Sequence, residues 1–390
     1  MAAQIHGLSV VRKNDGLPMI PDASQAVCGL LCTGDDTDAS KIPLNTPVLF
    51  TNSVEALNYV GSKGTIGSAI EAMSNQTRSP VVIVRVSDST TPATLEANLK
   101  GGVSNGQYTG MKAFLTAKSR FGIAPKIFGA PGLDSITVTA SFAAIAEQVG
   151  GFLYANSNAA TKEQAVTNRA NFGQRELMLI YGDFLSGAET VHSIAAAMGL
   201  RAKLDDDPSY GVGKSISNVP INGVDGMGFY TDWDYRNKNT DAQYLNEQGL
   251  SVLIKHKGFR IWGNRTTSAD LEWPFETYVR TDQFLADTMA DVMFSTIDAK
   301  PTVGLIKDRV LMFDAKLKDL TREEKIVGGG AWFDPSVNTA ANLSAGQFFF
   351  DYDYTPFSPM EHITLTQRKT TRYWVDLVKQ VAQIVPSPAI

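Results

Sequence analysis

The sequence of 390 residues contains only two cysteines, four histidines and no excess of basic residues. Cys28 and Cys32 lie four residues apart in an apolar run, without the second pair that a zinc site would need. If this run is a strand, both thiols point to one face, and we expect them to be buried and reduced. The formal net charge of -5 argues against a nucleic-acid-binding protein, which normally has a basic balance.

Long apolar runs are missing as well. No stretch of about 18 uncharged apolar residues is present, so the sequence predicts no membrane span. The first residues show no basic start followed by an apolar run, and we expect no secretion signal. Hydrophobic residues make up 43% of the chain and charged residues 19%, which suits a protein with a sizeable core. We therefore expect a soluble protein made in the cytoplasm.

Motifs for catalysis or cofactor binding are also lacking. Gly211 to Ser215 resembles the end of a phosphate-binding loop, but Pro208 stands where the first glycine is required. Asp351 and Asp353 share a face if they lie on a strand, where a solvated or ion-paired surface is the simpler interpretation. We predict no catalytic residue, no metal and no cofactor, and none of the histidines has metal-ligand spacing to another: His6, His192, His256 and His362.

What is present is the alternation of strands and helices typical of an α/β protein, with a parallel or mixed sheet covered by helices. The run Pro80-Val-Val-Ile-Val-Arg-Val is almost entirely β-branched and is expected to be buried on both faces. The other predicted strands are 27–32, 47–51, 126–130, 151–155, 176–181, 251–254 and 258–262. The predicted helices are 53–59, 66–74, 141–149, 162–171, 189–201, 304–320 and a C-terminal helix around 374–384.

Two polar stretches interrupt this pattern. Residues 87–110 are rich in Ser, Thr, Asn and Gly and indicate a domain boundary or an exposed crossing. Residues 205–240 combine acidic, glycine and proline residues and read as a long surface excursion. At the end of the chain, residues 362–369 alternate apolar residues with threonine and predict a strand before the last helix.

The segment Gly258-Phe-Arg-Ile-Trp-Gly-Asn-Arg-Thr266 carries a family resemblance. It resembles the Gly-x-Arg-x-Trp-Gly-Asn-Arg-Thr segment of tail sheath proteins from contractile-tailed phages, including temperate enterobacterial phages, and from R-type pyocins. On a strand, Arg260 and Trp262 share the face opposite Phe259 and Ile261, and a turn follows. The residues that carry this signature are Gly258, Arg260, Trp262, Gly263, Asn264 and Arg265.

Further similarity to this family extends over almost the whole chain and is weakest in residues 205–245. The resemblance implies a sheath core of residues 21–87 and 246–360, an outer α/β insertion of residues 88–245, and terminal arms of residues 1–20 and 361–390. It also implies stacked six-membered rings around a tail tube, in a virion tail or a headless bacteriocin particle assembled in the host cytoplasm. Baseplate and tail terminator proteins would be further partners. Contraction from a metastable extended state would drive the tube through the host cell envelope.

In this family the arms add strands to the sheets of neighbouring subunits, which implies this role for Leu8 and Val10, and for Ile363, Leu365 and Gln367. The alternative is that both arms pack back on their own domain. The arms carry net charges of +1 and +2, so the remaining residues carry -8. Basic arms and an acidic body favour docking onto another copy.

The predicted helix 304–320 has an apolar stripe flanked by charged residues and is a candidate for contact with the tube. An ordinary surface helix would show the same pattern. The candidate residues for tube contact are Lys307, Lys316, Lys318, Arg322 and Lys325. Two other functional hypotheses stay open at this point: a cytosolic α/β enzyme, which a deep pocket with convergent polar groups and a shifted pKa would favour, and a tube-like ring component.

Overall fold

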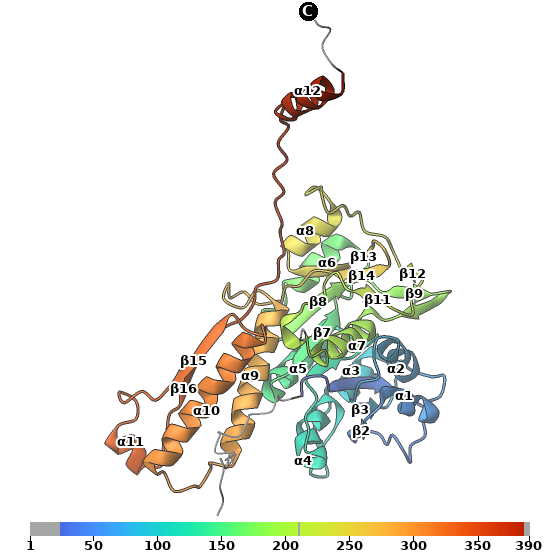
Figure 1. The fold of residues 1–390 in the computed structure, drawn as a ribbon. Helices are drawn as coiled ribbons and strands as arrows, with labels where there is room; N and C mark the ends of the chain where they lie inside the picture. The colour runs from blue at the N-terminus through green and yellow to red at the C-terminus, as the bar shows by residue number, and fades with distance from the viewer. Residues whose placement is uncertain (1–23, 210, 386–390) are drawn as a thin grey trace, which may run out of the picture. The chain divides into compact units, whose positions relative to one another are not determined.

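The computed structural model of the chain describes residues 24–209 and 211–385. It divides into one compact unit up to Ser358 and a second unit that begins at Pro359. Figure 1 shows the course of the chain through these elements. The predicted arm of residues 1–20, with Leu8 and Val10, lies outside the described residues.

A sheet of nine strands forms the centre of the first unit, in the order β11-β14-β13-β8-β7-β6-β1-β3-β2. Strand β1 pairs in parallel with both β3 and β6, and the parallel pairing continues through β7 and β8 to β13. Strands β2, β14 and β11 pair antiparallel with their neighbours. The bounds are Cys28–Thr33 (β1), Val48–Phe50 (β2), Val81–Val86 (β3), Ile127–Gly129 (β6), Phe152–Asn156 (β7), Leu177–Tyr181 (β8), Pro220–Ile221 (β11), Leu250–Lys255 (β13) and Phe259–Trp262 (β14).

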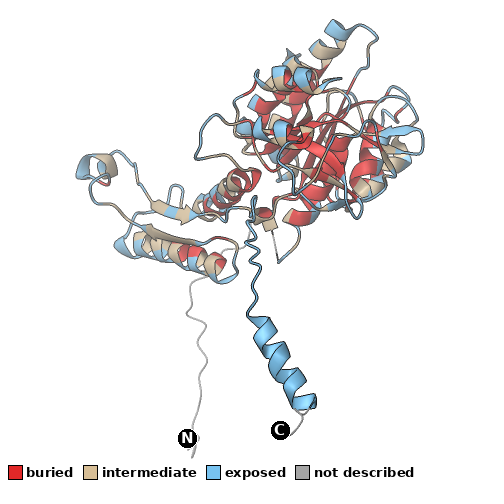
Figure 2. Cartoon of the chain, turned by 90° about the horizontal axis from the view of Figure 1, so that it is seen from above, coloured by how far each residue is buried: buried red, intermediate tan, exposed pale blue. Residues whose placement is uncertain are grey.

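Two hydrophobic cores cover the two faces of this sheet, as the β-branched strands predict (Figure 2). Cys28 and Cys32 lie in the first core, and Leu31 lies in the second. Both thiols are buried and unpaired, which confirms the prediction made for them. The first core is closed by Ser53–Ala56 (α1), Ile66–Ser74 (α2) and Ser193–Asp205 (α7), and the second by Pro92–Lys100 (α3), Ala117–Phe121 (α4), Ile136–Val149 (α5), Lys162–Arg169 (α6) and Asp241–Glu247 (α8).

A third, smaller core lies between two long helices and a two-stranded sheet. Leu285 comes from the first helix, and Phe313 and Leu317 come from the apolar stripe that the sequence placed on the second. The elements are Glu276–Phe294 (α9), Val303–Arg322 (α10), Gly328–Trp332 (β15), Ala340–Ser344 (α11) and Asp351–Thr355 (β16). None of the helices in residues 24–209 and 211–385 is long and apolar enough to span a membrane.

Short elements complete the first unit. They are the strands Val103–Ser104 (β4), Gln107–Tyr108 (β5), Phe184–Ser186 (β9), Glu189–Val191 (β10) and Gly226–Met227 (β12), and the 3-10 helices Leu57–Tyr59, Gly110–Thr116 and Gly211–Gly213. The stretch 87–110 therefore contains helix α3 and a small hairpin rather than a simple linker. Its Pro92 occupies the first turn of α3, where a proline is well tolerated.

The predicted division into a core and an outer insertion does not coincide with separate sheets. Residues 88–245 supply β6, β7 and β8, which lie between β1 and β13 in the nine-stranded sheet. The expected boundary at residue 245 falls inside α8. These strands are buried on both faces of the sheet, and the division into a core and an outer insertion stays a prediction.

The second unit contains one described helix, Tyr373–Ile384 (α12), as the sequence predicts. The strand expected at residues 362–369 does not form, and within the described residues this segment has no helix or strand. A strand needs a hydrogen-bonding partner, and no strand within residues 24–209 and 211–385 pairs with this segment. The pairing of residues 362–369 with another copy stays a prediction.

Candidate functional site

The C-terminal unit exposes its apolar side chains. Ile363 is 67% exposed and Leu365 is 88% exposed, and Gln367 is exposed as well. In α12, Trp374 and Val378 are 63% and 66% exposed (Figure 2). Exposed apolar side chains in this number are typical of a surface that contacts another molecule.

The two-stranded sheet offers unpaired strand edges. Strands β15 and β16 pair only with each other among the described residues. Asp351 and Asp353 lie on β16, and Asp353 Oδ1 accepts a hydrogen bond of 3.0 Å from the Gly330 backbone N–H. The predicted carboxylate pair is therefore part of a small acidic strand at an open sheet edge, which is a template for strand addition.

Four of the five candidates for tube contact lie on α10, and the fifth, Lys325, lies in the loop after it. Lys318 and Arg322 are largely exposed and form ion pairs within the helix, with Asp314 at 2.6 Å and Asp319 at 2.9 Å. Lys307 is exposed, and Lys316 is half-buried. Lys325 lies beyond α10; its side chain is 18% exposed, forms a 3.0 Å ion pair with Glu323 and lines a cavity below α7.

The signature residues build the hairpin at one edge of the large sheet and the corner that follows it. Phe259 and Ile261 point into the first core, and Trp262 packs on the opposite face against Trp233, with ring centroids 5.5 Å apart. Arg260 donates to the backbone oxygens of His256 and Lys257, at 2.9 and 3.4 Å. The alternation that the sequence predicted is present.

The end of the signature leads into α9. Gly263 has a φ of 140°, and a Cβ at this position would lie 2.4 Å from Ser251 Oγ, so only glycine fits. The Asn264 carbonyl accepts a 3.0 Å hydrogen bond from the backbone N–H of Glu276, the first residue of α9. The Arg265 guanidinium lies over the ring of Phe275, at 5.2 Å from its centroid. The signature thus fixes the start of α9 against the sheet.

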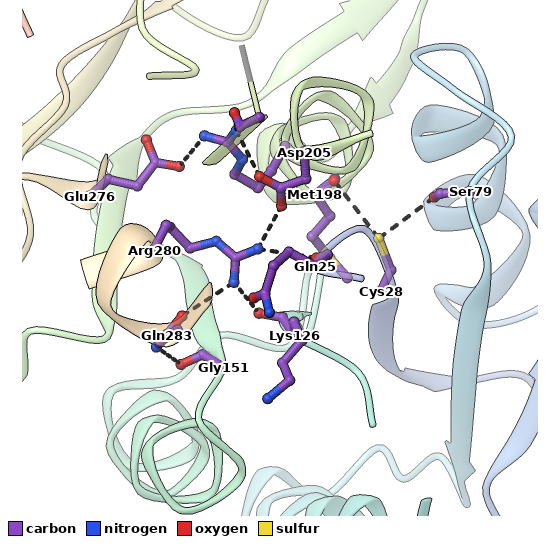
Figure 3. Close-up of polar contacts among 12 residues, drawn as sticks. Gln25, Cys28, Ser79, Lys126, Gly151, Met198, Asp205, Glu276, Arg280 and Gln283 are labelled. Carbon is purple, nitrogen blue, oxygen red and sulfur yellow. Dashed lines mark hydrogen bonds and ion pairs between the residues drawn. The ribbon is translucent and has the colours of Figure 1, made fainter. Parts of the chain in front are cut away.

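A buried network of charged side chains joins α9 to α7, and the sequence analysis did not find it (Figure 3). The side chains of Arg201, Asp205, Glu276 and Arg280 are fully buried. Arg201 lies 2.8 Å from Asp205 and 3.3 Å from Glu276, and Arg280 lies 2.5 Å from Asp205. The two positive and two negative charges of the network balance. The Tyr154 hydroxyl donates a hydrogen bond to Glu276, and burial raises the pKa of this tyrosine.

The same network holds the point at which the N-terminal segment enters the first unit. Arg280 donates to the backbone oxygens of Gln25 and Lys126, at 3.1 and 2.9 Å (Figure 3). The Gln25 amide donates to Asp287 at 2.9 Å, and the Lys126 ammonium lies 2.6 Å from the same carboxylate. Gln25 is therefore tied to α9 at two points.

A cleft with convergent polar groups opens at the carboxyl ends of β6, β7 and β8. Its volume is about 840 Å³, and Asp134, Asn156, Asp183 and His192 are among the residues that line it. Burial raises the pKa of Asp134 well above its usual value, and the neighbouring Asp183 adds to the rise. Burial also acts on Asp183, but His192 and Ser193 outweigh it and lower its pKa. A deep cleft with polar groups and a shifted pKa is the feature that the enzyme hypothesis required. The described residues contain no group of three side chains placed to hold a metal.

Comparison with known proteins decides between the hypotheses. Residues 101–267 match the family of phage tail sheath protein central domains, and residues 268–370 match the phage tail sheath C-terminal domain. The tail sheath protein of Escherichia phage P2 is 41% identical over 390 residues, which cover 96% of this chain and 98% of the relative. The chain belongs to the phage tail sheath family. The major tail sheath protein of Serratia phage KSP20 is 38% identical, with coverage of 95% and 96%.

Solved structures show the same fold at low sequence identity. The helical sheath of the anti-feeding prophage in its contracted state has a TM-score of 0.70 at 14% identity, over 95% of this chain and all of that one. The contracted sheath complex of the extracellular contractile injection system PVC has a TM-score of 0.71 at 13% identity, over 95% and 99% of the two chains. The fold of contractile sheaths is therefore kept although most residues differ.

The sheath family membership gives the protein a structural role in a phage tail or tail-like particle, and it removes the enzyme hypothesis. The cleft at the strand ends is thus not an active site. The family boundary at residues 267 and 268 lies just before α9, so the corner built by the signature residues connects the two family domains. The residues that organise this connection are those of the signature and of the buried charged network.

Proposed function

We propose that this sheath subunit polymerises by strand exchange into stacked six-membered rings around a tail tube. The observation that carries the proposal is the C-terminal segment, whose Ile363 and Leu365 are exposed and pair with no strand among the residues that the structure describes. Residues 1–20 would supply a second connecting strand. Strand addition satisfies the backbone groups of both partners and buries these apolar side chains.

The acceptor is the two-stranded sheet β15–β16 of a neighbouring copy. Its strands are five residues long, and the segment 362–369 is long enough to pair along either edge. The charges support this assignment, because Asp351 and Asp353 lie on β16 whereas Arg368 and Lys369 end the segment. Opposite charges on adjacent strands favour the pairing and fix its direction.

Contraction is proposed to convert a metastable extended lattice into a lattice of lower free energy. The exchanged strands keep neighbouring subunits connected while the first unit moves largely as a rigid body. A few kcal/mol per subunit is enough, because the gain adds up over many copies. The solved sheaths of similar fold include contracted assemblies, which supports this mechanism for the present chain.

The exposed basic side chains of α10 are proposed to hold the extended sheath on the tail tube. Lys307, Lys318 and Arg322 are the most accessible of the five candidates, whereas Lys325 is largely covered. Lys316 lies between them on the same helix. Baseplate and tail terminator proteins would close the two ends of the sheath. These contacts would be weakened by salt, because exposed charges are screened.

Negative-stain microscopy of the purified chain tests the strand exchange. The unchanged chain should form long striated cylinders, and Ile363→Asp with Leu365→Asp should reduce them strongly, because an aspartate cannot be buried at a strand interface without cost. Leu271→Asp is the matched control, since Leu271 is 91% exposed in the first unit. Cylinders of normal yield from the arm variant, or equal loss in the control, would contradict the proposal.

A second assembly measurement tests the contact with the tube. Lys307, Lys318 and Arg322 are replaced together by glutamine, and co-assembly with purified tail tubes is followed at increasing salt concentrations. The variant should fold and form cylinders alone, but should coat tubes less well. Lys63→Gln, which changes another exposed lysine, serves as the control. Coating that matches the unchanged chain at low salt would argue against this role for α10.

A further inference from the structure

The roots of both terminal arms are attached to the same helix. At the N-terminal root, Gln25 is bonded to Arg280 and Asp287 of α9, at 3.1 and 2.9 Å. At the C-terminal root, the Ser358 hydroxyl shares a hydrogen bond with the Tyr278 hydroxyl, also on α9. These attachment points span residues 278–287 of one helix, a length of about 14 Å at the rise of an α-helix.

A third contact connects this stretch of α9 to the open two-stranded sheet. Tyr354 of β16 donates a hydrogen bond of 2.9 Å to Asp282. Burial raises the pKa of Tyr354, and the adjacent Asp282 raises it further, so the phenol stays protonated and remains a donor. The N-terminal root, the C-terminal root and the acceptor edge therefore all meet the first three turns of α9.

The charged network makes this stretch of α9 stiff. Arg280 is fully buried and is bonded to Asp205 of α7 and to the backbone of Lys126, just before β6 (Figure 3). Gln283 donates to the Gly151 backbone oxygen at 2.7 Å, at the start of β7. A buried ion pair with fixed geometry resists reorientation, because any tilt would leave a charge unpaired in a medium of low dielectric. This stretch of α9 is thus held to α7 and to the starts of β6 and β7.

We infer that α9 is a coupling element which joins the two arm roots in series, so that a pull on one connecting strand changes the attachment of the other. The inference rests on the proposed role of the arms as connectors between subunits. It identifies Tyr278, Tyr354 and Asp287 as positioning residues for the arms. In the assembled sheath this coupling would carry the movement of one ring to the next through α9.

Cys28 is a natural reporter for the N-terminal root. It lies three residues after Gln25, is 0% exposed, and its thiol lies 3.8 Å from the Met198 backbone oxygen (Figure 3). Because the thiol is covered, an alkylating reagent reaches it only when the start of β1 opens, and release of the root three residues earlier is expected to make such openings more frequent. Cys32, four residues further along the same strand, is equally buried and reports on general unfolding.

The experiment removes contacts at the C-terminal root and at β16 and measures how fast the thiol next to the N-terminal root reacts. Tyr278→Phe with Tyr354→Phe removes two hydroxyls and keeps the rings, and alkylation of Cys28 in the dilute, unassembled full chain is measured by peptide mapping. Coupling predicts that Cys28 reacts faster by between about 2- and 30-fold, the range found for coupled sites, while Cys32 is unchanged. Tyr230→Phe is the control, since Tyr230 is 66% exposed and lies far in the sequence from both roots and from α9.

A second variant tests whether the roots act in series. Asp287→Ala removes the acceptor of the Gln25 side chain, and Asp291→Ala, one helical turn further on, is its control. In the Asp287→Ala chain, the two tyrosine changes should accelerate the reaction of Cys28 less than they do in the unchanged chain, because one of the two attachments of Gln25 is already lost. Additive effects, an unchanged Cys28 rate in the tyrosine variant, or equal acceleration of Cys32 would overturn the coupling. None of these results depends on cylinder formation, so the strand-exchange proposal is judged separately.

Discussion

Replacing Arg280 by methionine is the most severe test of the charged network. Methionine keeps the volume and the helical propensity of the position but removes every hydrogen bond of the guanidinium. The Asp205 carboxylate loses one of its two arginine partners, and the backbone oxygens of Gln25 and Lys126 lose a donor. The Asp205 side chain and Gln25 are buried, so the loss leaves buried acceptors without their charged donor.

Removal of one partner from a buried ion pair costs about 3–5 kcal/mol, because an uncompensated charge remains. At about 2 cal/mol/K per residue, the unfolding entropy of a unit of about 330 residues is about 0.7 kcal/mol/K. The thermal midpoint of the unassembled chain should therefore fall by about 4–7 K in scanning calorimetry. The change should also speed alkylation of Cys28, since the N-terminal root loses one of its two attachments.

Arg120→Met is the control for this prediction. Arg120 is exposed on α4, so the same substitution there should change the unfolding free energy by no more than about 0.5 kcal/mol. If Arg280→Met shifts the midpoint no further than Arg120→Met, the network contributes no more than a surface charge. The account of α9 as a rigidly held helix would then be wrong.

Three further predictions concern other parts of the first unit. Burial raises the pKa of Asp134, so ionisation of this carboxyl lowers the unfolding free energy as the pH rises above 3.8. Asp134→Asn should therefore raise the unfolding free energy at pH 7. Chemical denaturation should show that this difference vanishes near pH 3. The pKa of Asp183 is lowered, so its carboxylate stabilises the fold above pH 3.8 and loses this effect in acid. Asp183→Asn should therefore lower the unfolding free energy at pH 7 in the same measurement. Gly263→Ala should destabilise the chain by about 1–3 kcal/mol in denaturant titrations, and more than Gly122→Ala, where φ is also positive but no atom lies near the added Cβ.

Most of the large sheet is predictable from sequence, because its strands are buried on both faces. The run Val81–Val86 can only be a central strand, and its Arg85 is accommodated by hydrogen bonds to two backbone oxygens, of Ile42 and Gly34. Helix α10 is equally visible, since its apolar residues repeat with helical spacing. Helix α3 was missed because its composition resembles that of a linker, and only packing of Leu99 into the second core makes it a helix.

Some of the candidate residues could be placed from the sequence and others could not. The faces of Arg260 and Trp262 follow from strand alternation, and the structure confirms them. Ile363 and Leu365 are exposed and lie outside any strand of the described residues, so the pairing that the alternation of residues 362–369 predicts stays a prediction. The accessibility of Lys325 could not be predicted either, since it depends on a cavity formed by α7 and α9.

The buried charged network could not be predicted from the sequence. Arg201 and Asp205 have the i, i+4 spacing of an ordinary exposed helical ion pair, a pattern worth only a few tenths of a kcal/mol. Both side chains are nevertheless fully buried, whereas Lys203 between them is exposed, so Arg201 and Asp205 must find their partners inside the protein. Those partners, Glu276 and Arg280, are supplied by the family's C-terminal domain, about 75 residues later in the chain. The two domains of the sheath subunit are therefore joined by a balanced set of buried charges to which both contribute.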